Sequence, residues 1–189
     1  MSKTNDVIVL LVGPSGSGKS TIADALSNQY GWKQVASYTT RPPRYDGERG
    51  HTFISDAEFD TLEIGKVIAY TEFDGHRYCA TTDQVEDADV YVVDLAGCET
   101  LKDLYHGKKK VLAVYVHCPP DERLERLIKR DGYEAAKRRV EYDRGSFTNG
   151  WARLAQLFDR VVIAFSSFGT PEESAKWIAE QVSQWREDG

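Results

Sequence analysis

Short apolar runs divide the chain. Five of them, rich in valine, isoleucine and tyrosine, lie at residues 7–13, 67–73, 89–95, 111–118 and 160–165. Runs of this length and composition are typical of strands, and the absence of polar alternation in several indicates burial on both faces. Helical patterns separate them, at about 19–29, 56–62, 97–105, 120–129, 134–145 and 172–186. This alternation predicts an α/β fold in which helices flank a central, mostly parallel sheet.

Two of these helices carry a clear start signal. Ser55 is followed three residues later by Glu58, and Thr170 by Glu173, with Pro171 at the first helical position. In such a capping box the hydroxyl and the carboxylate each satisfy a free backbone N–H of the first turn. We therefore expect helices to begin directly after Ser55 and Thr170.

Residues 33–80 interrupt the alternation. The segment is rich in turn-forming residues, as in RPPRYDGERG at 41–50, and holds one short helix and further strand-like pieces. The 189 residues contain no linker, repeat or low-complexity tract. We predict a single domain, with a core at 1–32 and 81–189 and a small insertion at about 33–80.

Composition narrows the class of protein. The net charge of −6 lacks the basic footprint of a general nucleic-acid-binding protein. The longest apolar run, residues 7–13, is too short to cross a bilayer. Three widely spaced cysteines, Cys79, Cys98 and Cys118, form neither a zinc motif nor a disulfide framework, so buried free thiols are expected at 98 and 118. A cytoplasmic protein without membrane or nucleic-acid partners is expected, as a monomer or homodimer.

A phosphate-binding loop follows the first predicted strand. Residues 13–21 read GPSGSGKST, which fits G-x-x-x-x-G-K-[ST] between a strand and a helix. Glycines allow the backbone N–H groups to curl around phosphate oxygens, and the helix adds its positive N-terminus. Lys19 is expected to reach the β- and γ-phosphates of ATP, and the Ser20 hydroxyl to ligate Mg²⁺. The predicted ATP-phosphate-binding residues are Gly13, Ser15, Gly16, Ser17, Gly18, Lys19, Ser20 and Thr21.

A second magnesium ligand is expected at Asp94. This residue ends an apolar strand, and a carboxylate at such a strand tip beside a phosphate-binding loop is a common Mg²⁺ ligand, directly or through water. Many strands end in aspartate, so this position indicates a Mg²⁺ ligand only because a phosphate-binding loop is expected beside it.

A second cluster of phosphate-binding residue types lies at 37–44, which reads SYTTRPPR. Arginine binds phosphate through its two-pronged guanidinium, and hydroxyl groups donate further hydrogen bonds. Such a cluster about twenty residues beyond the first loop indicates an acceptor that itself carries a phosphate.

The chain resembles the guanylate kinase family. The resemblance rests on GPSGSGKST, on S-x-T-T-R-x-P-R at 37–44, and on further matches that extend to about residue 165. It implies a P-loop kinase fold with an acceptor-binding insertion and a lid at about 130–140. It implies transfer of the γ-phosphoryl group of ATP, with Mg²⁺, to a (deoxy)nucleoside 5′-monophosphate. Ser37, Arg41, Arg44 and Tyr78 would hold the acceptor phosphate.

The lid segment is crowded with basic residues around a possible hinge at Asp131-Gly132. Inserted arginines stabilise the charge that develops during phosphoryl transfer. The resemblance places Arg130 and Arg139 over the phosphates, with Arg138 as an equally basic alternative to Arg139. Lys19 and these three arginines are the candidate catalytic residues.

The chain departs from the family where the guanine base binds. Ala69 stands where the family has a glutamate, and Ala80 where it has a hydroxyl. Glu72 or Thr81 could replace these groups by a slip in register, and Asp94 also falls where the family contacts guanine. Because alanine accepts no hydrogen bond, the usual basis for guanine selection is lost.

A third departure is His51, which replaces a phosphate-binding tyrosine of the family in a shortened loop. We interpret it as a surface-loop histidine, with phosphate donation as the alternative. On the donor side, the Asn-Asp pair of the family after the last strand is replaced by Ala164-Phe165.

Two other functions stay open. One is a kinase of another phosphorylated small molecule, such as a ribose phosphate. The other is a non-catalytic phosphopeptide-binding module, which the intact Lys19 and Ser20 disfavour. A P-loop GTPase is disfavoured because no N-K-x-D motif occurs.

Overall fold

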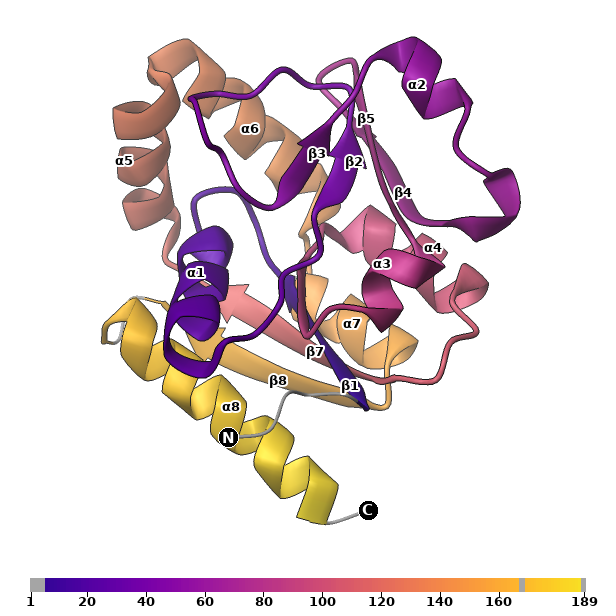
Figure 1. The fold of residues 1–189 in the computed structure, drawn as a ribbon. Coiled ribbons are helices and arrows are strands. Elements are labelled where there is room, and N and C mark those ends of the chain that lie inside the picture. Colours follow the sequence, from indigo (N-terminus) through magenta and orange to yellow (C-terminus); the bar gives the residue numbers. More distant parts are fainter. Residues whose placement is uncertain (1–5, 167–168, 188–189) are drawn as a thin grey trace.

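A four-stranded parallel sheet forms the centre of the computed structural model, which describes residues 6–166 and 169–187. Its strand order is β6–β1–β7–β8. The strands are β1 (Val7–Val12), β6 (Val90–Val92), β7 (Lys110–His117) and β8 (Arg160–Phe165). Figure 1 shows helices on both sides of this sheet, so the predicted α/β architecture is confirmed.

A second sheet of four strands stands beside the carboxyl edge of the first (Figure 1). Its order is β3–β2–β5–β4, with β2 (Ser37–Thr39), β3 (His51–Phe53), β4 (Val67–Phe73) and β5 (His76–Thr81). The β2–β3 pair is parallel and the other pairs are antiparallel. The β4–β5 register shifts between Ile68 and Thr71, where Ala69 takes a φ of 52°. All four strands therefore come from the turn-rich segment that interrupts the sequence pattern.

Eight α-helices and one 3₁₀ turn complete the described part of the chain. They are α1 (Lys19–Tyr30), α2 (Asp56–Asp60), η1 (Ile64–Lys66), α3 (Thr82–Glu86), α4 (Leu95–Leu104), α5 (Pro120–Asp131), α6 (Tyr133–Ser146), α7 (Gly150–Leu157) and α8 (Pro171–Glu187). Both capping boxes form as expected, at Ser55 with Glu58 and at Thr170 with Glu173. The pattern did not predict α3 and α7, which are short and whose stability comes from tertiary packing.

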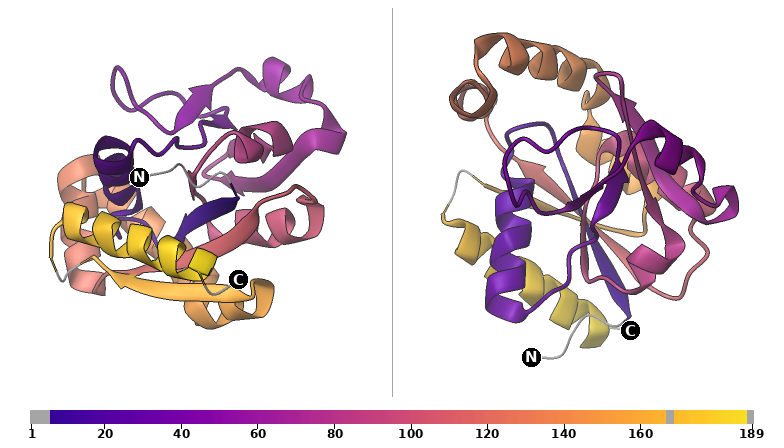
Figure 2. Two further views of the ribbon diagram at one scale, coloured as in Figure 1. Left: turned by 60° about the horizontal axis from the view of Figure 1, so that its bottom comes forward. Right: turned by 45° about the horizontal axis from the view of Figure 1, so that its top comes forward.

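The side chains of β1 divide the core into two layers. Val7, Val9 and Leu11 face α1 and α8, while Ile8 and Leu10 face the opposite layer. That opposite layer includes α4, α7 and parts of β4 and β5, so the second sheet shares a core with the first. Figure 2 shows α8 along one side of the central sheet and the second sheet on the other. The insertion at about 33–80 is thus packed directly onto the core that carries the P-loop.

All three cysteines are buried free thiols, as the sequence indicated for Cys98 and Cys118. Among the described helices, none is long and apolar enough to cross a membrane.

Shortening one buried side chain of the central strand β1 tests the shared core. Leu10 is wholly buried, so Leu10→Ala should lower the free energy of unfolding by about 2–5 kcal/mol through lost contacts and a cavity. Leu104→Ala removes the same atoms from a side chain that is 51% exposed and should cost far less. Urea denaturation of both variants measures the difference, and an equal loss would contradict the two-layer description of the core.

Candidate functional site

The P-loop is held in a tight turn between β1 and α1. Gly16 and Gly18 have φ values of 77° and 93°, in the left-handed region that glycine tolerates. A Cβ on Gly16 would lie 2.9 Å from the carbonyl oxygen of Arg123, so a larger residue would displace α5. The loop geometry therefore requires the glycines that the motif supplies.

Lys19 is bound by its own loop. Its Nζ donates to the carbonyl oxygens of Gly13, at 2.6 Å, and Pro14, at 2.9 Å. Burial lowers the pKa of Lys19 to about 8, although the nearby Asp143 and Asp94 carboxylates favour its charged form. The ammonium group is thus positioned at the loop and held there by contacts that a phosphate could replace.

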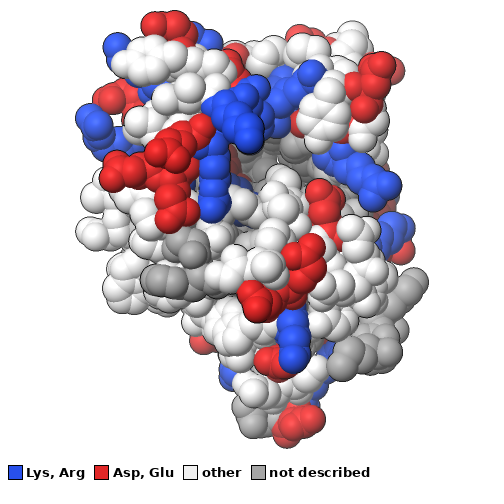
Figure 3. All heavy atoms as spheres, turned by 90° about the vertical axis from the view of Figure 1, so that its left-hand side faces the viewer, with Lys and Arg blue, Asp and Glu red and all other residues white. Residues whose placement is uncertain are grey.

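A cavity of about 590 Å³ opens in front of the P-loop, and we call it the donor cavity. Figure 3 shows a face that carries α1 and α5, where basic side chains gather beside a hollow. Six of the eight predicted phosphate-binding residues and four arginines line this cavity: Ser15, Gly16, Gly18, Lys19, Ser20, Thr21, Arg44, Arg126, Arg130 and Arg139. Gly13 lines a second cavity instead, and Ser17 is wholly buried, with a hydroxyl that has no partner among the described residues.

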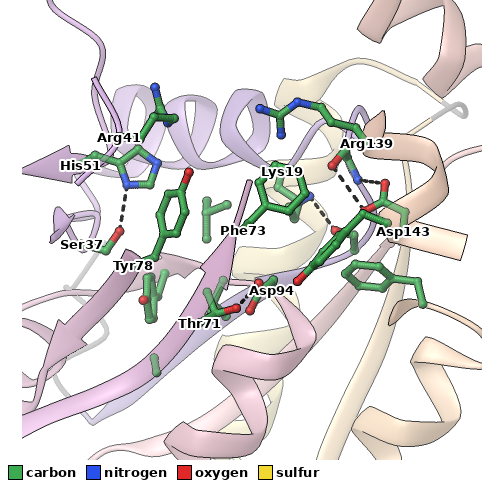
Figure 4. A pocket seen from close by; sticks show the side chains of 18 of the residues that line it. Lys19, Ser37, Arg41, His51, Thr71, Phe73, Tyr78, Asp94, Arg139 and Asp143 are labelled. Atoms are coloured by element: carbon green, nitrogen blue, oxygen red, sulfur yellow. Dashed lines mark hydrogen bonds between the residues drawn. The ribbon is translucent and has the colours of Figure 1, made fainter. Parts of the chain in front are cut away.

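The second cavity, of about 190 Å³, lies between the P-loop, the second sheet and α6, and we call it the acceptor cavity. Six of the eight predicted acceptor-binding residues line it: Ser37, Arg41, Arg44, His51, Tyr78 and Asp94. Figure 4 shows Ser37, Arg41, His51 and Tyr78 grouped on one side of this cavity.

Glu72 and Thr81 do not reach the acceptor cavity. Alternation along β4 directs Thr71 and Phe73 into the cavity and leaves Glu72 exposed, where its carboxylate accepts a hydrogen bond from the Tyr70 hydroxyl. Thr81 instead caps α3 together with Gln84. Neither residue therefore lies at the site. The slip in register that would have placed Glu72 or Thr81 at the positions of Ala69 and Ala80 does not occur.

A buried carboxylate organises the two arginines of the 37–44 segment. Arg41 is 7% exposed and pairs with both oxygens of Glu48, at 2.8 and 3.1 Å. The Arg44 guanidinium donates to Glu48 at 3.0 Å and the Arg44 backbone N–H at 2.7 Å. Burial would raise the pKa of Glu48, but these bonds outweigh it and hold the pKa at about 2. The Nε of Arg41 is buried without a partner among the described residues, so the group retains a free donor.

His51 is not a surface-loop residue, and that interpretation was wrong. It lies on β3, half-buried, with Nδ1 2.9 Å from the Ser37 hydroxyl and its ring against Tyr78 at 5.9 Å. Burial, together with the Arg41 guanidinium, lowers the pKa of His51 to about 4. The imidazole is thus neutral near pH 7, and one ring nitrogen can still donate a hydrogen bond.

Asp94 caps a helix at the wall of the acceptor cavity. Its carboxylate accepts from the Gly97 backbone N–H at 2.7 Å and from the Thr71 hydroxyl at 3.0 Å, and burial raises its pKa. Ser20 lines the donor cavity and Asp94 the acceptor cavity, and the two cavities adjoin at Lys19, on whose charge Asp94 acts. Within residues 6–166 and 169–187, no three His, Cys, Asp or Glu side chains gather as a metal cluster.

Two of the three lid arginines share a carboxylate. Asp131 accepts two hydrogen bonds from Arg130, at 2.9 and 2.7 Å, and pairs with Arg139 at 3.2 Å. Arg139 lines both cavities and lies over the Phe73 ring at 5.1 Å. Arg138 lines neither, which favours Arg139 as the arginine that faces the site.

The sequence did not reveal three further residues at α6 that line the acceptor cavity. Tyr142 and Asp143 follow Arg139 at helical spacing on the same face, and Phe147 is the residue that caps the end of this helix. The Asp143 carboxylate accepts from the Ser15 backbone N–H at 2.7 Å and pairs with Arg123 at 3.3 Å. The spacing from Arg139 was the available signal, but a charged and aromatic helix face is also typical of an exposed helix.

The two cavities meet at a common set of side chains. Ser15, Lys19, Arg44, His51 and Arg139 line both. A lysine and two arginines therefore stand at the junction between a P-loop cavity and an arginine-lined acceptor cavity, which is the arrangement required for transfer of a phosphoryl group between two bound molecules.

The neutral His51 predicts a specific pH dependence of stability. Its pKa is about 4 in the folded protein against an ordinary 6.5, so the unfolded chain binds the proton more readily between these values. The stability contributed by the neutral imidazole is present above pH 6.5 and is lost as the pH falls toward 4. His51→Gln should flatten the fall of the unfolding free energy over this range, whereas the exposed His106→Gln should not. Parallel slopes for His51→Gln and the unaltered protein would contradict this.

Comparisons with known proteins agree with this geometry. A family model described as an AAA domain matches residues 9–147. Guanylate kinases of Porphyromonas gingivalis and Nostoc sp. are each 30% identical, over 79% and 71% of this chain and 86% and 72% of their own lengths. For the guanylate kinase of Paraburkholderia xenovorans, also 30% identical, the chain spans 60% of the relative's length.

A solved structure supports the fold. The guanylate kinase of Anaplasma phagocytophilum superimposes with a TM-score of 0.58 at 22% identity, over 97% of this chain and 88% of that one. The relatives at 30% identity confirm the resemblance stated from the motifs. The chain belongs to the guanylate kinase family of P-loop nucleoside monophosphate kinases.

Proposed function

We propose that the protein transfers the γ-phosphoryl group of ATP to a nucleoside 5′-monophosphate and so forms the diphosphate. The observation that carries this proposal is the junction of the two cavities at Lys19, Arg44 and Arg139. A phosphoryl group passing between the cavities would be surrounded by positive charge. Such transfer requires little covalent chemistry from the protein, so positioning and charge stabilisation account for catalysis.

On the donor side, the triphosphate would lie along the P-loop. Lys19 would exchange its two carbonyl partners for phosphate oxygens, and the free N–H groups of the loop would complete the cradle. Mg²⁺ bound with ATP would neutralise phosphate charge, and the Ser20 hydroxyl is the residue of the donor cavity suited to hold it. Asp94, in the adjoining cavity, would hold the ion directly or through water, and the nucleotide phosphates would supply further ligands.

On the acceptor side, Ser37, Arg41, Arg44 and Tyr78 would hold the phosphate of the monophosphate, with His51 as a neutral hydrogen-bond donor. Glu48 holds the two guanidinium groups side by side. Arg130 and Arg139 would act as lid residues when the phosphates draw them away from Asp131. The printed names of the relatives make GMP the first acceptor to test.

The lining of the acceptor cavity favours a nucleotide over a ribose phosphate. Beyond the phosphate-binding side chains it presents the rings of Phe73, Tyr142 and Phe147, with Phe73 and Tyr142 in edge contact at 4.5 Å. Aromatic rings are suited to a flat base and contribute little to a bare sugar phosphate. The complete P-loop and its large cavity likewise support an enzyme over a phosphopeptide-binding module.

Removal of Arg41 tests the acceptor site. In Arg41→Ala, kcat/KM for the best monophosphate should fall by about 10²-fold or more, because charge-assisted bonds to phosphate are lost. The affinity for ATP, measured by calorimetry, should stay within a few-fold. The control Arg144→Ala alters an arginine whose side chain is 73% exposed and which pairs only with Glu141 among the described contacts. A coupled ADP-release assay measures turnover, and full activity of Arg41→Ala on every acceptor would contradict the proposal.

A further inference from the structure

The two helices that carry the lid arginines are also attached to the P-loop. Helices α5 and α6 pack against each other and are joined at Gly132, and Figure 1 shows this pair beside α1. Arg130 and Arg139 lie near the joined ends, where Asp131 binds both. That shared carboxylate holds the two arginines together, but their position relative to the P-loop depends on contacts made elsewhere on the two helices.

Both backbone polar groups of Ser15 bind one of these helices. The N–H donates to Oδ2 of Asp143, on α6, at 2.7 Å, and the carbonyl oxygen accepts from Arg123, on α5, at 3.4 Å. The Ser15 hydroxyl lies 3.4 Å from Oδ1 of the same carboxylate. Arg123 and Asp143 also pair with each other at 3.3 Å. One residue of the P-loop is therefore bound by an ion pair that connects the two helices.

This ion pair is buried and is directed at the loop. The side chains of Arg123 and Asp143 are 11% and 4% exposed. Arg123 lines neither cavity, and both oxygens of the Asp143 carboxylate lie within hydrogen-bond distance of Ser15. A buried ion pair contributes little to stability relative to apolar side chains of similar volume, because desolvation offsets the attraction of the charges. Its bonds to Ser15 instead fix the distance and direction of α6 from the loop.

Asp143 lies one helical turn from Arg139. At a spacing of four residues the two side chains share a face of α6, about 6 Å apart along its axis. Figure 4 shows both at the end of the acceptor cavity that lies away from Ser37. Arg139 lines both cavities. A displacement of α6 from Ser15 would therefore move the Arg139 guanidinium relative to any phosphate bound at the loop.

We propose that Asp143, together with Arg123, is a positioning residue for phosphoryl transfer, because it holds α6 to the P-loop and so places Arg139 at the transferred group. The donor phosphates would bind the same loop, so the arginine is placed relative to the charge that it must stabilise. Asp143 acts here through Arg139 and not on a substrate. This inference rests on the proposed kinase function and identifies the side chains that position its lid arginine.

Two double variants that differ in a single acceptor group test the proposal in the full chain. Arg123→Met/Asp143→Leu replaces the ion pair by apolar side chains and leaves neither charge unpaired. With ATP, Mg²⁺ and the best monophosphate, its kcat should fall by about 10²-fold, the effect of misplacing a catalytic group, while both KM values change only a few-fold. Arg123→Met/Asp143→Asn restores an acceptor oxygen for the Ser15 N–H and should recover most of the lost kcat.

A cycle with Arg139→Ala separates positioning from a general loss of structure. If the pair acts through Arg139, Arg123→Met/Asp143→Leu should lower kcat by no more than about threefold once this arginine is absent. A purely structural role would lower kcat by the same factor in either background and would also lower the temperature of thermal unfolding. Should the apolar variant not fold, Asp143→Glu, which keeps both charges and shifts the carboxylate by one methylene, provides the same cycle.

The control alters an exposed ion pair of the same helix. Glu141 and Arg144 are 72% and 73% exposed and pair at 3.4 Å. Glu141→Gln/Arg144→Met should leave kcat within about twofold of the unaltered protein, because exposed ion pairs contribute little.

The outcomes separate this inference from the function on which it rests. Full turnover by Arg123→Met/Asp143→Leu, or a loss that multiplies with that of Arg139→Ala, would overturn the inference and leave the kinase function standing. An absence of turnover by the unaltered protein with every monophosphate would overturn both.

Discussion

The burial of β1 is the constraint on which the rest of the molecule depends. Every side chain of Val7–Val12 is at most 1% exposed, and they point alternately into two separate layers of the core. The backbone N–H and C=O groups of a strand that is buried on both faces cannot bind water, so they need neighbouring strands on both edges. The strands β6 and β7 are these neighbours. The P-loop follows at its carboxyl end, so the position of the phosphate site is set by the most buried element of the fold. The second sheet packs on one of the same layers, and this brings the acceptor cavity against the loop.

Paired charges explain how an acidic chain can hold a basic site. Glu48 and Asp131 each bind two arginines at the edges of the two cavities, and Asp143 binds Arg123. Guanidinium groups that converge on one point repel one another, and the carboxylates offset this repulsion. Each guanidinium group carries five N–H donors, so it can bind a phosphate through donors that the carboxylate does not use. The positive field is therefore local, although the net charge of the chain is −6.

Helix α6 connects the parts of the site. Arg139 reaches both cavities, Tyr142 contacts Phe73 of the second sheet, and Asp143 binds the P-loop backbone at Ser15. These residues share one helix face because their spacing matches the helical repeat. A displacement of α6 would therefore alter the donor loop, the lid arginine and the acceptor wall together, which is a structural basis for linking occupancy of the two cavities.

The sequence by itself determined the parallel sheet, the P-loop and the two-arginine segment, because each depends on local signals. Burial periodicity, left-handed glycines and closely spaced phosphate-binding side chains are all visible within a few residues. Only the tertiary structure decided the positions of Asp94, Glu72, Thr81 and His51. Their surroundings depend on helix capping, on the β4 bulge and on pairing between strands far apart in the chain. Asp143 and Thr71 were invisible for the same reason: their partners, Ser15 and Asp94, lie 128 and 23 residues away. Local propensity marks which residues can do chemistry, but packing decides which of them meet.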